Sequence, residues 1–123
     1  MAYRIFHITD FFGDVPFFDA GKGFQDLELL RVKFDSQEEI YKFLLEELKW
    51  VEDNIKAASE AFMEDGTPYA TLGEFDNLLN NDMVLWRKFA NSLRLRHAMR
   101  MVEKDPDFAT PILKEISEND LPI

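Results

Sequence analysis

Cysteine is absent from the 123 residues of this chain, and only two histidines occur, His7 and His97. A chain without cysteine has no disulfide, no thiolate metal ligand and no cysteine nucleophile. Two histidines so far apart in the sequence do not indicate a transition-metal site, and we expect both to be structural. We therefore expect no bound metal and no cofactor.

Long apolar runs are also missing, since no stretch approaches the roughly 18 residues that a membrane-spanning helix needs. The first residues, MAYRIFHITDFF, contain neither the basic segment nor the uninterrupted apolar segment of a signal peptide. We expect no membrane contact and a cytoplasmic location. The length fits a single globular domain, residues 1–123.

Basic residues are scarce, because 14 lysines and arginines stand against 24 acids and leave a net charge of −10. The excess is uneven: residues 36–82 contain twelve acids and three bases, whereas residues 83–104 contain one acid and six bases. Such a chain is expected to attract a basic partner and not to bind nucleic acid directly. The plainer alternative is that the acidity only keeps the protein soluble.

Glycine and proline number five each, and three of the glycines and one proline fall in the segment Asp10–Phe24, DFFGDVPFFDAGKGF. This segment also holds five phenylalanines, four of them in doublets. In an extended segment the two rings of a doublet point to opposite sides. One ring of each doublet is therefore expected to cover the core while its neighbour is exposed for contact. The alternative is that all five rings are buried.

Two segments have the aromatic and β-branched composition of strands, Tyr3–Thr9 and Leu27–Phe34. Paired through the long segment between them, they predict a β-hairpin. The predicted fold class is α+β, with an N-terminal β-hairpin or small antiparallel sheet followed by a cluster of three to four helices.

The longest of these helices is predicted to start at Ser36, which forms a capping box with Glu39. Gly66 and Pro68 are expected to end it. Apolar residues in steps of three and four predict that one stripe of the helix packs along another helix. The stripe comprises Tyr41, Leu44, Leu48, Val51, Ile55, Ala58 and Phe62.

Three shorter helices are predicted downstream. Thr71 is expected to cap the first, and Asp82 the second, which runs from Met83 to about Glu103 and is apolar almost all round. Such a helix is expected to be central and largely buried. Thr110 and Pro111 are expected to start the last helix, since proline favours the first helical position. The residues expected to turn inward from the first short helix are Phe75, Leu78 and Leu79.

The basic segment 83–104 contains four arginines, and two roles are open to Arg87, Arg94, Arg96 and Arg100. Pairing with carboxylates of the long helix or of the Asp-rich segment is the favoured one. The other is a contact with nucleic acid, which the negative charge of the remaining chain would oppose.

Carboxylates and aromatic rings on the first two helices and the Asp-rich segment form the predicted partner-binding surface. Aromatic anchors are typical of interface hot spots, and acidic rims steer a basic partner. The candidate residues are Asp10, Asp14, Phe17, Phe18, Asp19, Asp26, Glu39, Glu46, Glu47, Glu52, Asp53, Glu60, Glu64, Asp65, Glu74 and Asp76.

In size, acidity, lack of cysteine and clustered acids, the chain resembles the small acidic DNA-mimic and inhibitor proteins of bacteria and phages. The resemblance implies that it occupies the DNA-binding surface of a basic DNA-binding protein. The alternative is an immunity or inhibitor protein that neutralises a toxin or nuclease. Either protein would be a cytoplasmic monomer or dimer without enzymatic activity.

No catalytic motif stands out. Gly21-Lys22-Gly23 lacks the spacing of a phosphate-binding loop, and Asp10, Asp14 and Asp19 are not at the offsets of an EF-hand. A small hydrolase that uses a pair of carboxylates is the third hypothesis for the function.

Overall fold

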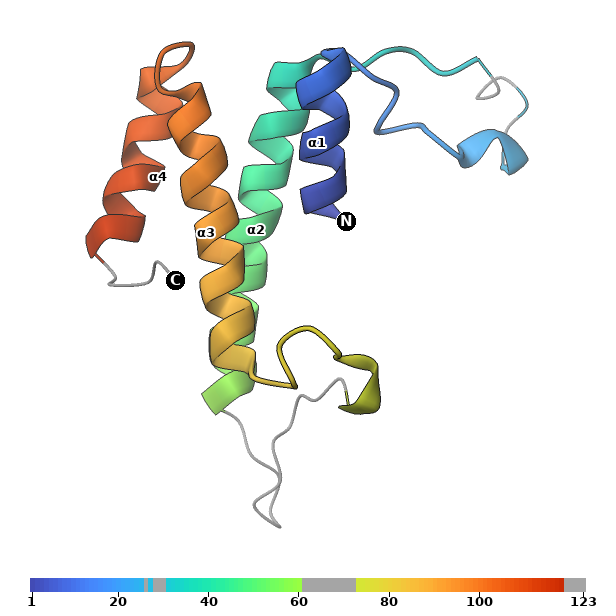
Figure 1. The fold of residues 1–123 in the computed structure, drawn as a ribbon. Coiled ribbons are helices and arrows are strands. Elements are labelled where there is room, and N and C mark those ends of the chain that lie inside the picture. The colour runs from blue at the N-terminus through green and yellow to red at the C-terminus, as the bar shows by residue number, and fades with distance from the viewer. Residues whose placement is uncertain (26, 28–30, 61–72, 119–123) are drawn as a thin grey trace. The chain divides into compact units, whose positions relative to one another are not determined.

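The structure is a computed structural model that describes residues 1–25, 27, 31–60 and 73–118. It contains four α-helices: α1 (Ala2–Phe12), α2 (Gln37–Glu60), α3 (Met83–Met101) and α4 (Pro106–Glu118) (Figure 1). Two short 3-10 turns, η1 (Lys22–Phe24) and η3 (Gly73–Phe75), complete the described elements. None of the described helices is long and apolar enough to cross a membrane.

The residues fall into two compact units, Met1–Leu44 and Leu45–Ile123, so that the boundary lies within α2. Unit 1 contains α1, the long connection after it and the first two turns of α2. Unit 2 contains the rest of α2 together with α3 and α4. That the chain forms one domain stays a prediction.

The predicted α+β fold is wrong, because the described residues contain no strand. Tyr3–Thr9, predicted as a strand, lies inside α1. The second predicted strand, 27–34, falls partly outside the described residues. Its described residues, 27 and 31–34, are not part of a strand. The described residues contain one isolated antiparallel bridge, between Val15 and Asp35, with backbone N···O distances of 3.2 and 3.0 Å.

Helix α1 is stabilised because its buried face packs against the start of α2. Phe6 and Thr9 are fully buried and lie three residues apart, which places them on one side of a helix. The Phe6 ring meets the Tyr41 ring edge-on at 4.9 Å, and the Tyr41 hydroxyl donates to Asp10. The Gln37 amide donates to the Thr9 carbonyl at 2.7 Å. These contacts override the β-propensity of the segment, since such propensity depends on its packing context.

The capping box at the start of α2 is confirmed. The Ser36 hydroxyl accepts a hydrogen bond from the Glu39 backbone N–H at 3.2 Å. In return, the Glu39 carboxylate accepts from the Ser36 hydroxyl at 2.9 Å and from the Ser36 backbone N–H at 3.4 Å. The expected end at Gly66 and Pro68 lies outside the described residues. Within the helix the buried face is wider than the predicted stripe, since it comprises Ile40, Tyr41, Leu44, Leu45, Leu48 and Glu52.

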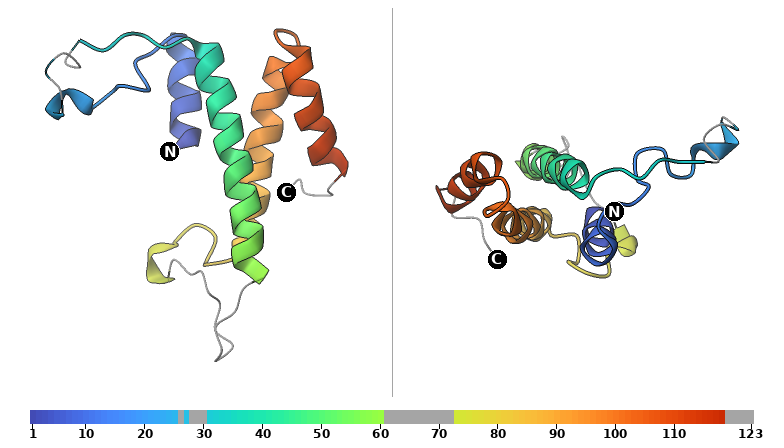
Figure 2. Two further views of the ribbon diagram at one scale, coloured as in Figure 1. Left: turned by 180° about the vertical axis from the view of Figure 1, so that it is seen from behind. Right: turned by 90° about the horizontal axis from the view of Figure 1, so that it is seen from above.

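In unit 2, α3 and α4 run antiparallel and side by side (Figures 1 and 2). Asp82 caps α3 as predicted, accepting from the Leu85 N–H at 3.0 Å. Helix α4 starts earlier than predicted, because Asp105 accepts from the Phe108 N–H at 3.1 Å and Pro106 takes the first position. Pro111 therefore lies inside the helix.

Two predictions about burial in unit 2 are also wrong. Helix α3 is buried along one face only, with Val84 and Met99 exposed elsewhere. The predicted short helix near Glu74 is a single 3-10 turn, in which Phe75 is 86% exposed, and Leu78 beyond it is exposed as well. Thr71, its predicted cap, lies outside the described residues. Sequence periodicity alone did not distinguish a buried helix from one with an exposed apolar side.

Candidate functional site

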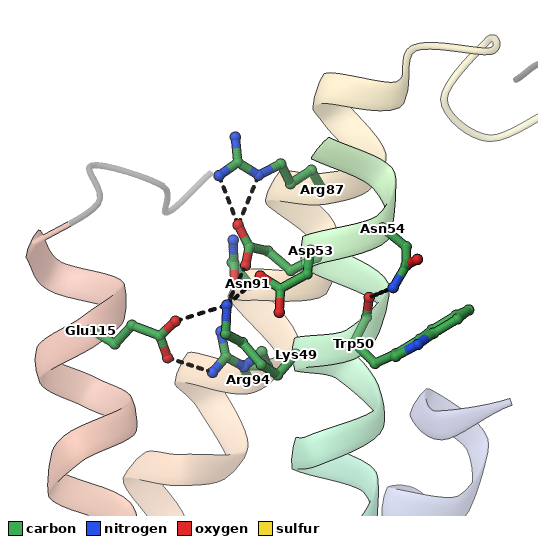
Figure 3. A network of polar contacts seen from close by, with 9 residues as sticks. Lys49, Trp50, Asp53, Asn54, Arg87, Asn91, Arg94 and Glu115 are labelled. Carbon is green, nitrogen blue, oxygen red and sulfur yellow. Dashed lines mark hydrogen bonds and ion pairs between the residues drawn. The ribbon is translucent and has the colours of Figure 1, made fainter. Parts of the chain in front are cut away.

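A network of charged side chains joins the three helices of unit 2 (Figure 3). Its centre is Glu52 on α2, which is 6% exposed. One carboxylate oxygen of Glu52 accepts from Nε and Nη2 of Arg87 on α3 at 2.8 and 2.7 Å, and the other accepts from Nζ of Lys49 at 3.0 Å. Burial by itself would raise the pKa of Glu52, but the hydrogen bonds from Arg87 and Lys49 lower it well below its ordinary value.

The network continues to α4 through Glu115. Its carboxylate pairs with Lys49 at 3.0 Å and with Nη2 of the buried Arg94 at 2.9 Å. Burial would lower the pKa of Lys49, yet hydrogen bonds to Asp53, Glu115 and Glu52 raise it above its ordinary value. Each charge in this network has an opposite partner, so its role is to hold α2, α3 and α4 together. Its inward carboxylates are not a free binding surface.

Trp50 lies on α2 with its ring turned away from this network (Figure 3). It is 62% exposed, and its carbonyl accepts from the Asn54 side-chain amide at 2.7 Å. Asn54 and two exposed acids, Glu46 and Glu47, are three or four residues from Trp50, on the same side of the helix. A large aromatic ring is thus flanked by hydrogen-bonding groups. We call these four residues the Trp50 surface.

A third arrangement in unit 2 is the loop held by Asp76. The Asp76 carboxylate accepts from the N–H groups of Leu78, Leu79 and Asn81 at 2.8 to 3.1 Å, and from the Trp86 indole at 2.6 Å. The hydrogen bond from the Leu79 N–H is the largest of the causes that lower the pKa of Asp76 to about 2. Asp76 therefore orders the loop before α3 and is not available to a partner.

In unit 1 the phenylalanine-rich segment is ordered by a buried carboxylate, that of Asp35. It accepts from the backbone N–H groups of Phe17 and Phe18, both at 2.9 Å. These hydrogen bonds, with that of Phe18 first, lower the pKa of Asp35. The rings of Phe17 and Phe18 each meet Phe43 of α2, at 5.7 and 5.3 Å between centroids. Both doublets were expected to split between core and solvent, but Phe11 and Phe12 are both exposed, whereas Phe17 and Phe18 are both half-buried.

The predicted partner-binding residues differ in their exposure, and their role as a binding surface stays a prediction. Those that are exposed are Asp14, Glu39, Glu46, Glu47 and Asp53, and those that are half-buried are Asp10, Phe17, Phe18 and Asp19. Glu52 and Asp76 are buried. Asp26, Glu64 and Asp65 lie outside the described residues, as do the side chains of Glu60 and Glu74.

The basic helix divides its arginines between two faces. Arg87 and Arg94 point inward. Arg87 pairs with Glu52 of α2, as predicted, whereas Arg94 pairs with Glu115 of α4, which was not among the predicted partners. Arg96 and Arg100 are exposed. Spacing could have indicated this division, because residues two apart on a helix, such as Arg94 and Arg96, point in different directions.

Sequence reasoning did not select Trp50 as a site residue, although its place off the apolar stripe of α2 was visible. An aromatic ring off the apolar stripe indicates a second packing contact of the helix. Only the structure shows that the ring is exposed and that Asn54 lies beside it. Among the described residues, no group of three or more histidines and carboxylates could hold a metal ion.

Comparison with known proteins gives one family. No curated protein matches the chain. The model of a SusD-like family, described as starch-binding and associating with the outer membrane, matches residues 1–123. Members of such a family are binding proteins, which is consistent with a chain that is not an enzyme.

This match corrects the functional expectations drawn from composition. The resemblance to DNA-mimic and inhibitor proteins was misleading, and so were the expected partners, a basic DNA-binding protein or a toxin or nuclease. The cytoplasmic location and the absence of membrane contact are corrected too, since the family is associated with the outer membrane. Net charge does not specify a fold or a partner, which is why it misled. Because the match covers all of residues 1–123, the chain belongs to this SusD-like, starch-binding family.

Proposed function

We propose that this protein binds an α-glucan of the starch type at the outer membrane, without chemical conversion, and that the Trp50 surface contacts the sugar. The observation behind this proposal is the 62% exposed indole of Trp50 beside Asn54 and two exposed carboxylates. The family description supplies the class of ligand and the location.

The chemistry of a glucan suits such a surface. A pyranose ring has an apolar face of C–H groups, which can stack on an aromatic ring, and an edge of hydroxyl groups that need donors and acceptors. Trp50 offers the ring, Asn54 an amide, and Glu46 and Glu47 acceptor oxygens. Because a glucan is neutral, the acidity of the chain does not oppose its approach.

Four carboxylates of the described structure are unsuited to be the general acid of a hydrolase. A general acid at neutral pH needs a raised pKa, yet the pKa values of Asp35, Glu52, Asp76 and Glu115 are all lowered, by hydrogen bonds from backbone N–H groups or from cationic side chains. These four groups are held in ion pairs or by backbone hydrogen bonds. They are suited to ordering the fold.

The test is the affinity of the intact chain for soluble starch, measured by affinity electrophoresis or calorimetry. We expect Trp50→Ala to weaken binding roughly tenfold or more, because an aromatic stack contributes on the order of 1 kcal/mol beyond its buried area. Phe75→Ala is the matched control, since it removes another exposed aromatic ring of unit 2. No binding by the native chain would refute the function, whereas an equal loss in both variants would refute the assignment to Trp50.

Two further readouts complete this test. Incubation with starch should release no new reducing ends, and their appearance would show that the protein is a hydrolase. Fractionation of the source cells should place the protein with the outer membrane. Its recovery in a soluble fraction alone would contradict the proposed location.

A further inference from the structure

The polar groups around Trp50 mostly accept hydrogen bonds. Glu46 and Glu47 lie four and three residues before Trp50, about 5–6 Å from it between Cβ atoms, and a carboxylate has acceptor oxygens only. Asn54 uses one of its two amide N–H groups on the Trp50 carbonyl, at 2.7 Å, and keeps its side-chain oxygen as an acceptor. A sugar stacked on the indole ring must therefore supply most of the donors.

The negative charges of Glu46 and Glu47 are not neutralised by a neighbouring cation. Both side chains are exposed, and among the described residues neither takes part in an ion pair. The lysines nearest to them along α2 are engaged elsewhere, since Lys42 pairs with Glu38 at 2.7 Å and Lys49 belongs to the charged network of the interior. The Trp50 surface thus carries two negative charges.

We infer that Glu46 and Glu47 determine the specificity of the Trp50 surface, which accepts neutral sugars and rejects sugars that carry carboxylate or sulfate groups. The inference rests on the proposed function, because it concerns the same contact with a glucan. A hydroxyl group can donate to a carboxylate, whereas an anionic substituent has only acceptor oxygens and the same sign of charge. Repulsion of this kind is a common source of specificity.

The size of the effect follows from the short distance. Two unit charges about 6 Å apart in water change an affinity by about threefold, so that two carboxylates beside one anionic group weaken its binding by about tenfold. The remaining acids of the chain, whose net charge is −10, contribute less. At physiological ionic strength, exposed charges more than about 8 Å apart are largely screened.

The experiment compares three starches of equal chain length: neutral starch, starch with carboxymethyl groups and starch with quaternary ammonium groups at the same low density. Calorimetry measures the affinity of the full chain for each at low and at physiological salt. We expect the carboxymethylated starch to bind about tenfold more weakly than the neutral one, and the ammonium starch to bind more tightly. Salt should reduce both differences. Trp50→Ala should weaken the binding of all three, because they share one surface.

The decisive variant is Glu46→Gln/Glu47→Gln, which keeps acceptor oxygens but removes both charges. Its affinity for carboxymethylated starch should rise about tenfold, while that for neutral starch should stay within about twofold. The control is Glu103→Gln/Glu118→Gln, which removes the same charge from exposed positions after α3 and at the end of α4. Its affinity for carboxymethylated starch should change less than about twofold.

A second variant, Glu47→Lys, reverses one charge and should bind carboxymethylated and neutral starch about equally. Circular dichroism checks that all variants are folded. Equal affinity of the native chain for these two starches would overturn the inference and leave the glucan function standing. An equal gain in the control variant would also overturn it, since the net charge would then cause the rejection. Absence of binding to every starch would refute the proposed function and the inference together.

Discussion

One oxygen of the buried Glu52 carboxylate accepts two hydrogen bonds from the Arg87 guanidinium, at 2.8 Å from Nε and 2.7 Å from Nη2. The other oxygen accepts from Lys49, and Lys49 in turn reaches Glu115 on α4 (Figure 3). A single buried carboxylate thereby links α2 to α3 and, through Lys49, to α4. The interior of unit 2 is held by ion pairs as well as by apolar side chains.

Removing the charge of Glu52 should therefore destabilise unit 2. Glu52→Gln leaves Arg87 and Lys49 without their charged partner in a site shielded from water. We expect the free energy of unfolding to fall by about 2–4 kcal/mol, somewhat less than for a fully buried pair because Arg87 is partly exposed. Urea denaturation followed by circular dichroism measures the change.

The control is Glu47→Gln on the same helix. Glu47 is exposed, and its replacement should change the free energy of unfolding by no more than about 0.5 kcal/mol. If both variants were equally stable, the network would have no structural role. A double variant, Glu52→Gln with Arg87→Met, should recover part of the loss, since it also removes the unpaired cation.

Asp76 should make the stability of the loop before α3 depend on pH. Its pKa is lowered from 3.8 to about 2 in the folded protein, so its stabilising effect is present above pH 3.8 and is lost as the pH falls through about 2. Asp76→Asn removes this titration. We expect the variant to be less stable than the native chain at neutral pH, with the difference shrinking as the solution is acidified.

Tryptophan fluorescence offers a local measure of that effect. In a Trp50→Phe background Trp86 is the one remaining tryptophan, and its indole donates to Asp76 at 2.6 Å. Acidification should shift its emission in the chain that keeps Asp76 and much less in the Asp76→Asn variant. A shift of equal size in both chains would show that Asp76 does not control the loop.

Phe6 should determine whether α1 stays helical. Its side chain is fully buried and meets Tyr41, so Phe6→Ala should lower the stability of unit 1 by about 3–5 kcal/mol. Hydrogen exchange should then be faster along Ala2–Phe12, while the amides of α3 keep their protection. Phe11→Ala, at an exposed position of the same helix, is the control and should leave exchange unchanged. Unaltered protection of α1 in Phe6→Ala would show that this helix does not depend on its contact with α2.

Salt should have little effect on the proposed contact with starch. Starch binding at the Trp50 surface involves a neutral ligand and should change less than about twofold between low and physiological salt. Titrations of the native chain with starch at both salt concentrations measure the change. A steep salt dependence of starch binding would contradict a stacking contact at Trp50.

Helix starts that are marked by local chemistry could be predicted from the sequence. Ser36 with Glu39 at the start of α2, and Asp82 at the start of α3, each form the predicted cap, because a cap depends on residues within one turn. The inward pairing of some α3 arginines also followed from composition, since buried cations need partners. Composition does not indicate which of the arginines pair.

Features that depend on contacts between distant residues could not be predicted in this way. Tyr3–Thr9 has the composition of a strand, yet it is helical because Phe6 and Thr9 bury against Tyr41 and Gln37. The choice between Arg94 and Arg96 as the buried cation depends on where Glu115 lies. The exposure of Trp50 is decided in the same way, by what packs against each face of α2. Local sequence sets where a helix begins, whereas the burial of each side chain depends on the partner that the fold brings to it.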